Sequence, residues 1–333
     1  MKALLLKSYS GSAGIELVEI KVSEPGKGEV LVKMAAAPIN PSDLIFLQGR
    51  NPSSKALPSI PGFEGAGTVI AAGPGAAAKQ LLGKRVACRA SPKHGGSWAE
   101  FMITDAERCV PLLPKVSLPE GAMLLVNPLT AWGFIDIAKS EGHKCAIQTA
   151  AASSVGKMMV RWAHKKKFKL INIVRREEQV ETLRDMGAPY VLSSDDSHFE
   201  KELENLAHKL GAKVAFDTVG GSFANTILKA MPQGSELWSY GGLSGDPVSV
   251  QPMILIYQQK NVRGMWLPPL MIARGPKKFS VIMNEIQKNM QSAFKSEVRA
   301  TYPLHDFRKA LADYESGMSA GKSLFTPSPQ REG

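Results

Sequence analysis

Two apolar runs near the middle of the chain are separated by small, hydroxyl-bearing residues that could bind phosphate. The first run, Cys145–Thr149, leads into a small-residue turn and a helical pattern that opens at Gly156. The second run, Leu170–Val174, ends on Arg175 and Arg176. This order predicts a strand, a tight turn, a helix and a second strand, which is typical of a dinucleotide-binding unit. The turn would let the backbone approach a pyrophosphate, and the helix N-terminus would present free N–H groups and the positive end of its dipole.

The glycine signature of such units is incomplete here. Its three glycines would fall on Ala151, Ser153 and Gly156, so only the last one is present. The small side chains still permit a turn, and the Ser153 and Ser154 hydroxyls, beside Val155, could donate hydrogen bonds to phosphate. Taken alone, the motif fits an ordinary α/β turn as well as it fits a cofactor site.

The residue that ends the second apolar run indicates which dinucleotide is bound. Arg175 follows Gly156 by 19 residues, where a unit that binds NAD usually has an acidic residue for the ribose. A carboxylate there would repel a 2′-phosphate, whereas a guanidinium can pair with it. Arg175, with Arg176 beside it, therefore predicts NADPH.

The composition is that of a globular protein with two domains of ordinary size. The chain has 333 residues, of which 44% are hydrophobic and 21% are charged. No stretch approaches the ~20 apolar residues that cross a bilayer. The three cysteines are too few for a disulfide scaffold and have no metal-ligand spacing. We therefore expect a cytoplasmic protein without a membrane partner.

The formal net charge of +11 is compatible with several partners. Lysines gather at 165–167 and 277–278, and such clusters could attract nucleic acid or an anionic substrate. They lack interleaved aromatic residues and a nucleic-acid motif, so we favour a solvated helix end for the first cluster, where cations suit the dipole. A nucleic-acid partner is not expected, and the charge would help to attract NADPH.

The pattern of the sequence changes near Pro119. Before it, short apolar runs between Gly/Pro pairs predict a β-rich part; after it, alternating helical and strand patterns predict a parallel sheet with right-handed crossovers. We expect an α/β protein with a doubly wound Rossmann sheet and a second, β-rich domain. The predicted strands lie at 29–34, 67–71, 85–89, 190–193, 214–218 and 236–240, and the predicted helices at 130–138, 177–186, 198–210, 222–230 and 276–290.

Seven short motifs are spread over nearly the whole chain. They are APINPSD (37–43), PGFEGAG (61–67), GSWAE (96–100), NPLTAW (127–132), FDTVGG (216–221), YGG (240–242) and RGMW (263–266). Together they resemble the medium-chain dehydrogenase/reductase superfamily. The resemblance implies a GroES-like catalytic domain at 1–122, completed by 265–333, and a Rossmann domain at 123–264 that binds NADPH.

Within that superfamily, the chain resembles the zinc-free branch of quinone oxidoreductases and NADPH-dependent 2-enoyl thioester reductases. Zinc-dependent members carry a cysteine in the first motif and Gly-His-Glu in the second. This chain has Asn40 and Phe63 near those places, and neither supplies a thiolate or an imidazole, so we expect no metal. Without a Lewis acid, hydride donation to a conjugated acceptor is easier than alcohol oxidation, because a few hydrogen-bond donors stabilise the charge that spreads onto oxygen.

The resemblance also implies roles for individual residues. Asn40 would contact the nicotinamide end and orient the substrate, Thr130 would contact the cofactor, and Lys322 would reach back to the cofactor from the tail. The other implied cofactor contacts are the pyrophosphate turn Ser153, Ser154, Val155 and Gly156, the 2′-phosphate pair Arg175 and Arg176, the ribose segment Tyr240, Gly241 and Gly242, and the carboxamide segment Met265, Trp266 and Leu267.

One departure from the family bears on catalysis. Enoyl reductases of this kind have a tyrosine two residues after a Gln-Gly pair as a candidate proton donor, and the matching position here is Asn51. An amide is not a general acid. Water, Arg50 or Tyr257 would then assist the reaction, or the substrate would be a quinone that needs no such donor.

We therefore expect a zinc-independent, NADPH-dependent reductase of quinones or α,β-unsaturated carbonyl compounds. An enoyl-thioester reductase without the usual tyrosine is the alternative among enzymes. A non-catalytic NADPH-binding protein with a nucleic-acid or protein partner is the alternative outside them. The 256–266 segment should include an edge strand through which two copies pair as a homodimer, since pairing across a two-fold axis satisfies open hydrogen bonds.

Overall fold

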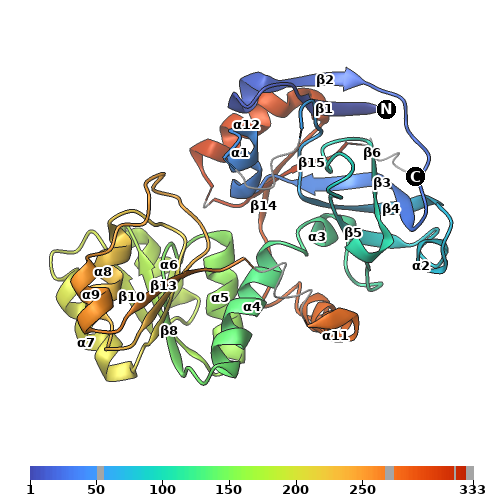
Figure 1. Cartoon of the computed structure of the whole chain (residues 1–333). Coiled ribbons are helices and arrows are strands. Elements are labelled where there is room, and N and C mark those ends of the chain that lie inside the picture. Colours follow the sequence, from blue (N-terminus) through green and yellow to red (C-terminus); the bar gives the residue numbers. More distant parts are fainter. Residues whose placement is uncertain (51–55, 267–273, 319, 328–333) are drawn as a thin grey trace. The chain divides into compact units, whose positions relative to one another are not determined.

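The computed structural model describes residues 1–50, 56–266, 274–318 and 320–327, and the chain divides into two compact units. Unit 1 comprises Met1–Val126 and Ser296–Gly333, and unit 2 comprises Asn127–Lys295 (Figure 1). Within the described ranges, no helix combines the length and the apolar character that crossing a bilayer would require.

Unit 2 is built on a parallel sheet of short strands, of which the central β8 and β11 are entirely buried. The spatial order of its described strands is β10-β9-β8-β11-β12-β13, and the chain reverses its direction of travel across the sheet between β8 and β11. That reversal makes the sheet doubly wound, and ligands of such sheets bind outside the carboxyl ends of the strands at this point. The strands are β8 (Cys145–Gln148), β9 (Lys169–Val174), β10 (Tyr190–Ser193), β11 (Val214–Asp217), β12 (Glu236–Ser239) and β13 (Asn261–Gly264).

Helices cover both faces of this sheet (Figure 1). Ile173 and Val174 are neighbours in β9 and so point to opposite faces. Ile173 packs in one core with Leu203 of α7 and Ile227 of α8, whereas Val174 packs in a second core with Val180 of α6. The helices of unit 2 are α4 (Asn127–Ser140), α5 (Ser154–Lys165), α6 (Glu177–Asp185), α7 (Phe199–Leu210), α8 (Phe223–Ala230), α9 (Pro252–Tyr257) and α11 (Gly275–Lys288).

Unit 1 is a mostly antiparallel sheet with the order β14-β15-β3-β4-β5-β7 among its described strands; β6 also pairs with β3, and β1 and β2 form a separate pair. Glycines let β3 and β4 approach closely. A Cβ atom at Gly65 would lie 2.5 Å from Met34 Cε, and one at Gly67 would lie 2.0 Å from the Lys33 carbonyl oxygen. The strands are β1 (Lys2–Leu6), β2 (Ile15–Glu19), β3 (Glu29–Pro38), β4 (Glu64–Ala72), β5 (Arg85–Arg89), β6 (Phe101–Asp105), β7 (Cys109–Pro111), β14 (Val298–Tyr302) and β15 (Lys322–Phe325).

The two ends of the chain share one core in unit 1. Phe46 of α1, Leu311 of α12 and Phe325 of β15 belong to a single buried cluster, in which the Trp98 and Phe325 rings lie 5.0 Å apart. The helices are α1 (Pro41–Leu47), α2 (Ala76–Lys79), α3 (Leu118–Ala122) and α12 (Phe307–Ser316), with 3-10 turns η1 (Gly11–Gly14), η2 (Ala106–Arg108) and η3 (Leu304–Asp306).

The predicted fold class is confirmed, and several predicted elements shift by a few residues. The helix predicted from residue 130 begins at Asn127, because Pro128 is tolerated in a first helical turn. The helix predicted to open at Gly156 begins at Ser154. The 256–266 segment holds two elements, since α9 ends at Tyr257 before the edge strand β13 begins at Asn261.

The unit boundaries differ from the predicted domain boundaries of 1–122 with 265–333 and 123–264. The described residues of the 265–295 range, 265–266 and 274–295, cluster with unit 2. Their helix α11 contacts α4, where Trp132 Nε1 donates a hydrogen bond to Glu285 Oε2 at 2.8 Å. The helix therefore belongs with the parallel sheet, and the chain re-enters the β-rich unit only at Ser296.

Candidate cofactor and active site

Most of the predicted cofactor contacts follow directly on strands of the parallel sheet in unit 2. Because carboxyl ends of parallel strands meet at one edge, the structure brings these segments together there. Thr130 lies in the same unit, half-buried on α4, and Leu267 lies outside the described residues. The segments are Ser153–Gly156 after β8, Arg175–Arg176 after β9, Tyr240–Gly242 after β12 and Met265–Trp266 after β13.

The turn after β8 ends in a helix N-terminus that can receive an anion. Ala150 has a positive φ of 49°, and Ser153 caps α5 by accepting a hydrogen bond from the Gly156 N–H at 3.1 Å. The N–H groups of Ser154 and Val155 have no hydrogen-bond partner within the described part of the chain. They are therefore available to phosphate oxygens. The Ser153 hydroxyl, which was predicted to donate to phosphate, acts as the helix cap.

Gly156 lets the helix pack tightly on the turn. A Cβ atom at this position would lie 2.4 Å from the Ala151 carbonyl oxygen. The buried Gln148 at the end of β8 holds the same turn, because its Nε2 donates to the Gly156 carbonyl oxygen at 3.2 Å. A larger residue than glycine would push α5 away from the turn.

The two arginines after β9 differ in their surroundings. Arg175 is exposed, and within the described residues its guanidinium has neither a hydrogen bond nor an ion pair. Its backbone is held, because its N–H donates to Gln179 Oε1 at 3.2 Å and its carbonyl accepts from Ser193 Oγ at 2.8 Å. Arg176 instead pairs with Glu178 at 2.9 Å. Arg175 is thus the arginine that is free to bind an added phosphate.

The segment after β12 is fixed by packing, and the segment after β13 begins with a backbone hydrogen bond to β12. The Tyr240 ring lies 4.6 Å from the Phe134 ring, and a Cβ atom at Gly241 would lie 2.2 Å from Thr218 Oγ1. Gly242 has open space where its side chain would be. The Met265 N–H donates to the Ser239 carbonyl at 2.8 Å, and Trp266 is 66% exposed.

In unit 1 a buried chain of hydrogen bonds joins Lys322, Asn40 and Glu64. Pairing of β15 with β3 sets Lys322 opposite Asn40, and the Lys322 ammonium donates to Asn40 Oδ1. Asn40 Nδ2 donates to Glu64 Oε1 at 3.0 Å. All three residues are at most 2% exposed. Since an ammonium only donates and a carboxylate only accepts, the Asn40 amide has a single orientation.

Glu64 also anchors the segment that leaves unit 1. Its Oε2 accepts hydrogen bonds from the N–H groups of Leu125 and Val126 at 2.9 and 3.0 Å, and Val126 is the last residue before unit 2. Its backbone carbonyl accepts from Ser97 Oγ at 2.6 Å. Glu64 was not among the predicted site residues, although it lies in the PGFEGAG motif.

Asp43 adds a second buried carboxylate to this cluster. It accepts hydrogen bonds from the N–H groups of Asn40 at 2.8 Å and Phe63 at 3.1 Å. Burial raises the pKa of Asp43 to about 7, against the opposing effect of these two N–H donors. Burial also raises the pKa of Glu64 and lowers that of Lys322, while their mutual attraction opposes both shifts.

Asn40 and Phe63 stand near the two positions at which zinc-dependent members of the superfamily carry a cysteine and a histidine. Asn40 is engaged by Lys322 and Glu64, and the Phe63 ring packs against Phe46 at 5.6 Å. Across the described residues, no group of three or more His, Cys, Asp or Glu side chains could hold a metal ion.

The predicted proton donors belong to different units. Arg50 is exposed in unit 1, where its N–H donates to the Ile45 carbonyl at 3.1 Å. Tyr257 belongs to unit 2 and is 75% exposed at the end of α9, so its ring is not part of the core. Asn51 lies outside the described residues.

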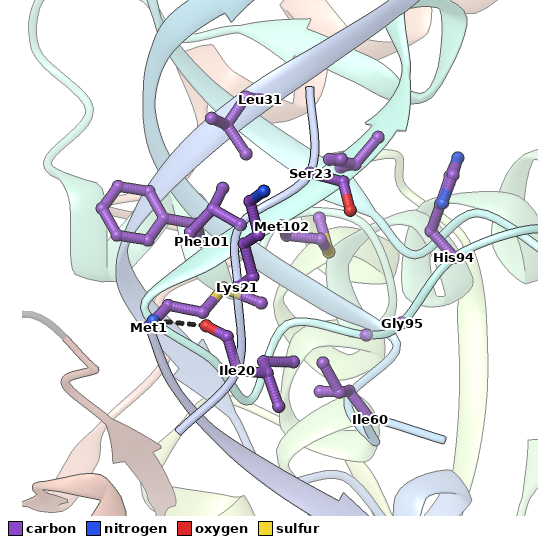
Figure 2. A pocket seen from close by; sticks show the side chains of 13 residues that line it. Met1, Ile20, Lys21, Ser23, Leu31, Ile60, His94, Gly95, Phe101 and Met102 are labelled. Atoms are coloured by element: carbon purple, nitrogen blue, oxygen red, sulfur yellow. Dashed lines mark hydrogen bonds between the residues drawn. The ribbon is translucent and has the colours of Figure 1, made fainter. Parts of the chain in front are cut away.

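A small pocket of about 130 Å³ lies elsewhere in unit 1 (Figure 2). Apolar side chains such as Ile20, Leu31 and Phe101 line it, and His94 stands at its side (Figure 2). His94 Nε2 lies 2.9 Å from Glu29 Oε1. None of the predicted site residues lines this pocket.

Burial of Asp43 makes the stability of the protein depend on pH. Its folded pKa of about 7 lies above the ordinary value of 3.8, so its contribution is complete below pH 3.8 and is lost as the pH rises through 7. The free energy of unfolding in urea should therefore be higher for wild type than for Asp43→Asn near pH 4, and this difference should shrink as the pH rises to about 7. Asp105→Asn is the control: because the pKa of Asp105 is lowered, its contribution is present above the ordinary value of 3.8 and does not decline as the pH rises to 7. An advantage over Asp43→Asn that is independent of pH would contradict the assignment.

Both units match known protein families. Residues 26–115 match the alcohol dehydrogenase GroES-like domain, and residues 154–287 match the zinc-binding dehydrogenase family. The mitochondrial enoyl-[acyl-carrier-protein] reductase of Caenorhabditis elegans is 30% identical over 310 residues, 89% of this chain and 86% of that protein. The rat enzyme of the same name is 28% identical over 324 residues, 93% of this chain and 84% of that protein.

Solved structures of similar proteins cover nearly the whole chain. A protein of Mesorhizobium loti described as an NADPH:quinone reductase is 36% identical, with 98% of each chain covered and a TM-score of 0.88. A mycobacterial protein solved in complex with NADPH is 26% identical, with 98% of this chain and all of that chain covered and a TM-score of 0.82. The chain belongs to the medium-chain dehydrogenase/reductase superfamily, in its branch of quinone and enoyl-thioester reductases.

Proposed function

We propose that the protein is an NADPH-dependent reductase that transfers a hydride to a quinone or another α,β-unsaturated carbonyl compound. The observation that carries the proposal lies at the carboxyl edge of the unit 2 sheet. There, the open N–H groups at the start of α5 suit a pyrophosphate, and the unpaired Arg175 guanidinium suits a 2′-phosphate. The NADPH in the mycobacterial relative supports this assignment.

The residues of unit 1 suit stabilisation of a developing oxyanion. When bound, NADPH supplies the hydride, and negative charge then moves onto the carbonyl or quinone oxygen of the acceptor. Asn40 Nδ2 retains one N–H and the Lys322 ammonium retains two beyond the hydrogen bonds found among the described residues. Donors held in advance in a buried site stabilise such charge strongly.

We further propose that this chemistry is independent of zinc. Asn40 and Phe63 replace the thiolate and imidazole ligands of the zinc-dependent enzymes, and packing against Phe46 fills the second position with an aromatic ring. Hydrogen-bond donors then take the place of a Lewis acid.

The acceptor class follows from the amide at position 51. A quinone yields a hydroquinone whose oxygens take protons from water, so no side-chain acid is needed, whereas an enoyl thioester needs a proton on carbon. This contrast favours a quinone over simple enones and enoyl thioesters, which both need a proton on carbon. The enoyl-thioester reductase is the second candidate, because the rat and Caenorhabditis elegans relatives carry that name.

Steady-state NADPH oxidation with a panel of quinones, enones and enoyl thioesters, each with and without a chelator, tests this function. We expect turnover to be fastest with quinones, slower with enones, and unchanged by the chelator. Turnover of enoyl thioesters alone would establish the second candidate. Tight NADPH binding without turnover of any acceptor would support a non-catalytic protein.

The role of Arg175 can be tested by cofactor preference. Arg175→Ala should weaken NADPH binding about 10- to 100-fold and leave NADH binding nearly unchanged, because only NADPH offers a phosphate to the guanidinium. Arg176→Ala is the matched control and should have a smaller effect, since its guanidinium pairs with Glu178. Equal weakening of both cofactors by Arg175→Ala, measured by titration calorimetry, would refute the assignment.

We propose that two copies pair through β13. This strand is at the edge of the sheet, and the surface near it exposes Ile256, Tyr257 and Val262. The Asn261 and Met265 N–H groups bond toward β12, so the alternation of a strand directs the Val262 N–H to the open edge.

Val262→Pro should therefore convert a dimer into a monomer without unfolding the sheet. Proline removes the N–H of the open edge and is tolerated at such positions. Sedimentation velocity of both proteins measures the outcome. A monomeric wild type, or a dimeric Val262→Pro protein, would contradict pairing through this edge.

A further inference from the structure

A buried carboxylate lies at the switch point of the unit 2 sheet. β8 and β11 are the neighbouring strands at which the strand order reverses. Asp217 is the last residue of β11 and Thr149 is the first residue after β8. Both side chains are fully buried. They therefore lie directly beneath the crevice in which sheets of this type bind their ligands.

Hydrogen bonds join Asp217 to the segments on both sides of this point. Its Oδ1 accepts from Thr149 Oγ1 at 2.7 Å and from the Val219 N–H at 3.0 Å, and its Oδ2 accepts from the Gly220 N–H at 3.0 Å. Thr149 Oγ1 in turn accepts from the Thr218 N–H at 3.0 Å. One carboxylate and one hydroxyl thus fix the turn after β8 against the loop after β11.

This loop then fixes the segment after β12. Gly220 and Gly221 both have positive φ, 73° and 62°, so the chain turns sharply there. The Leu243 N–H donates to the Thr218 carbonyl at 2.9 Å. With Gly241 against Thr218 Oγ1, the loops after β8, β11 and β12 form one connected arrangement that begins at Asp217.

We propose that Asp217 and Thr149 are positioning residues that set the spacing of the three loops around the cofactor. The inference rests on the proposed function, since the segments after β8 and β12 are assigned to NADPH and the loop after β11 joins them. The two residues act through the backbone they hold and need not touch the cofactor. A buried carboxylate beside a site for phosphates is tolerable because three donors point at it.

Substitutions of Asp217 and Thr149 differ in which of these hydrogen bonds they retain. Asparagine at 217 could keep the Thr149 and Val219 hydrogen bonds through its oxygen, but its amide nitrogen would face the Gly220 N–H. Valine at 149 keeps the shape of threonine but removes both the donor to Asp217 and the acceptor for Thr218. Serine at 149 retains both hydrogen bonds.

NADPH titration of the full-length protein by calorimetry, together with steady-state kinetics, tests the proposal. Thr149→Val should raise the Kd and KM for NADPH about tenfold, the effect of one or two lost buried hydrogen bonds, while the KM for the acceptor at saturating NADPH stays constant. Thr149→Ser should recover most of the affinity. Thr104→Val is the matched control, because Thr104 is equally buried in unit 1 and its hydroxyl donates to the Arg89 carbonyl at 2.6 Å.

The possible outcomes distinguish failure of the proposed function from failure of the inference about Asp217 and Thr149. Wild-type protein that binds no NADPH would overturn the proposed function and this inference with it. Wild-type binding with an unchanged Kd for Thr149→Val, or a change no larger than that for Thr104→Val, would overturn the inference alone. If Thr149→Val fails to fold, the Kd of Asp217→Asn for NADPH is measured instead. It should be raised, and an unchanged Kd would overturn the inference.

Discussion

The hydrogen-bond chain from Lys322 through Asn40 to Glu64 determines the arrangement around it in unit 1. Because the ammonium only donates and the carboxylate only accepts, the amide between them cannot turn over. The second Glu64 oxygen receives two backbone N–H groups from Leu125 and Val126, so both oxygens must remain acceptors. Replacing any member would leave an unmatched charge or donor where water does not reach. Asp217 imposes the same kind of constraint on the loops of unit 2.

The sequence alone predicted the parallel sheet well, and for a physical reason. Strands that are buried on both faces have continuous apolar sequences, so a segment such as Leu170–Val174 could be located from its local pattern. The strand β15 was not predicted. Its four residues, KSLF, lie within the Gly/Pro-rich tail of the chain. The strand β3 with which it pairs is distant in the sequence, so no local periodicity marks β15.

The residues of the candidate site likewise divide into those that local spacing reveals and those that only tertiary contacts reveal. Gly156 and Arg175 were predicted because their roles depend on spacing along the chain, and spacing is a property of the sequence. Asp43, Glu64 and Asp217 had no assigned role, because a sequence does not distinguish a solvated carboxylate from one that tertiary contacts bury and surround with donors. The unpaired state of Arg175 beside the paired state of Arg176 also became visible only in the structure.

The discontinuity of unit 1 has a consequence for the order of folding during synthesis. All residues of unit 2 lie within Asn127–Lys295, so its strands can pair as soon as that segment has left the ribosome. Asn40 and Glu64 are made much earlier, but their cationic partner Lys322 is made last, with a sequence separation of 282 residues from Asn40. Until then, unit 1 holds carboxylates without their counter-charge and lacks the strand that completes its sheet. The second unit encoded is therefore the first that can be completed, and closure of the β-rich unit is the late, long-range step of folding.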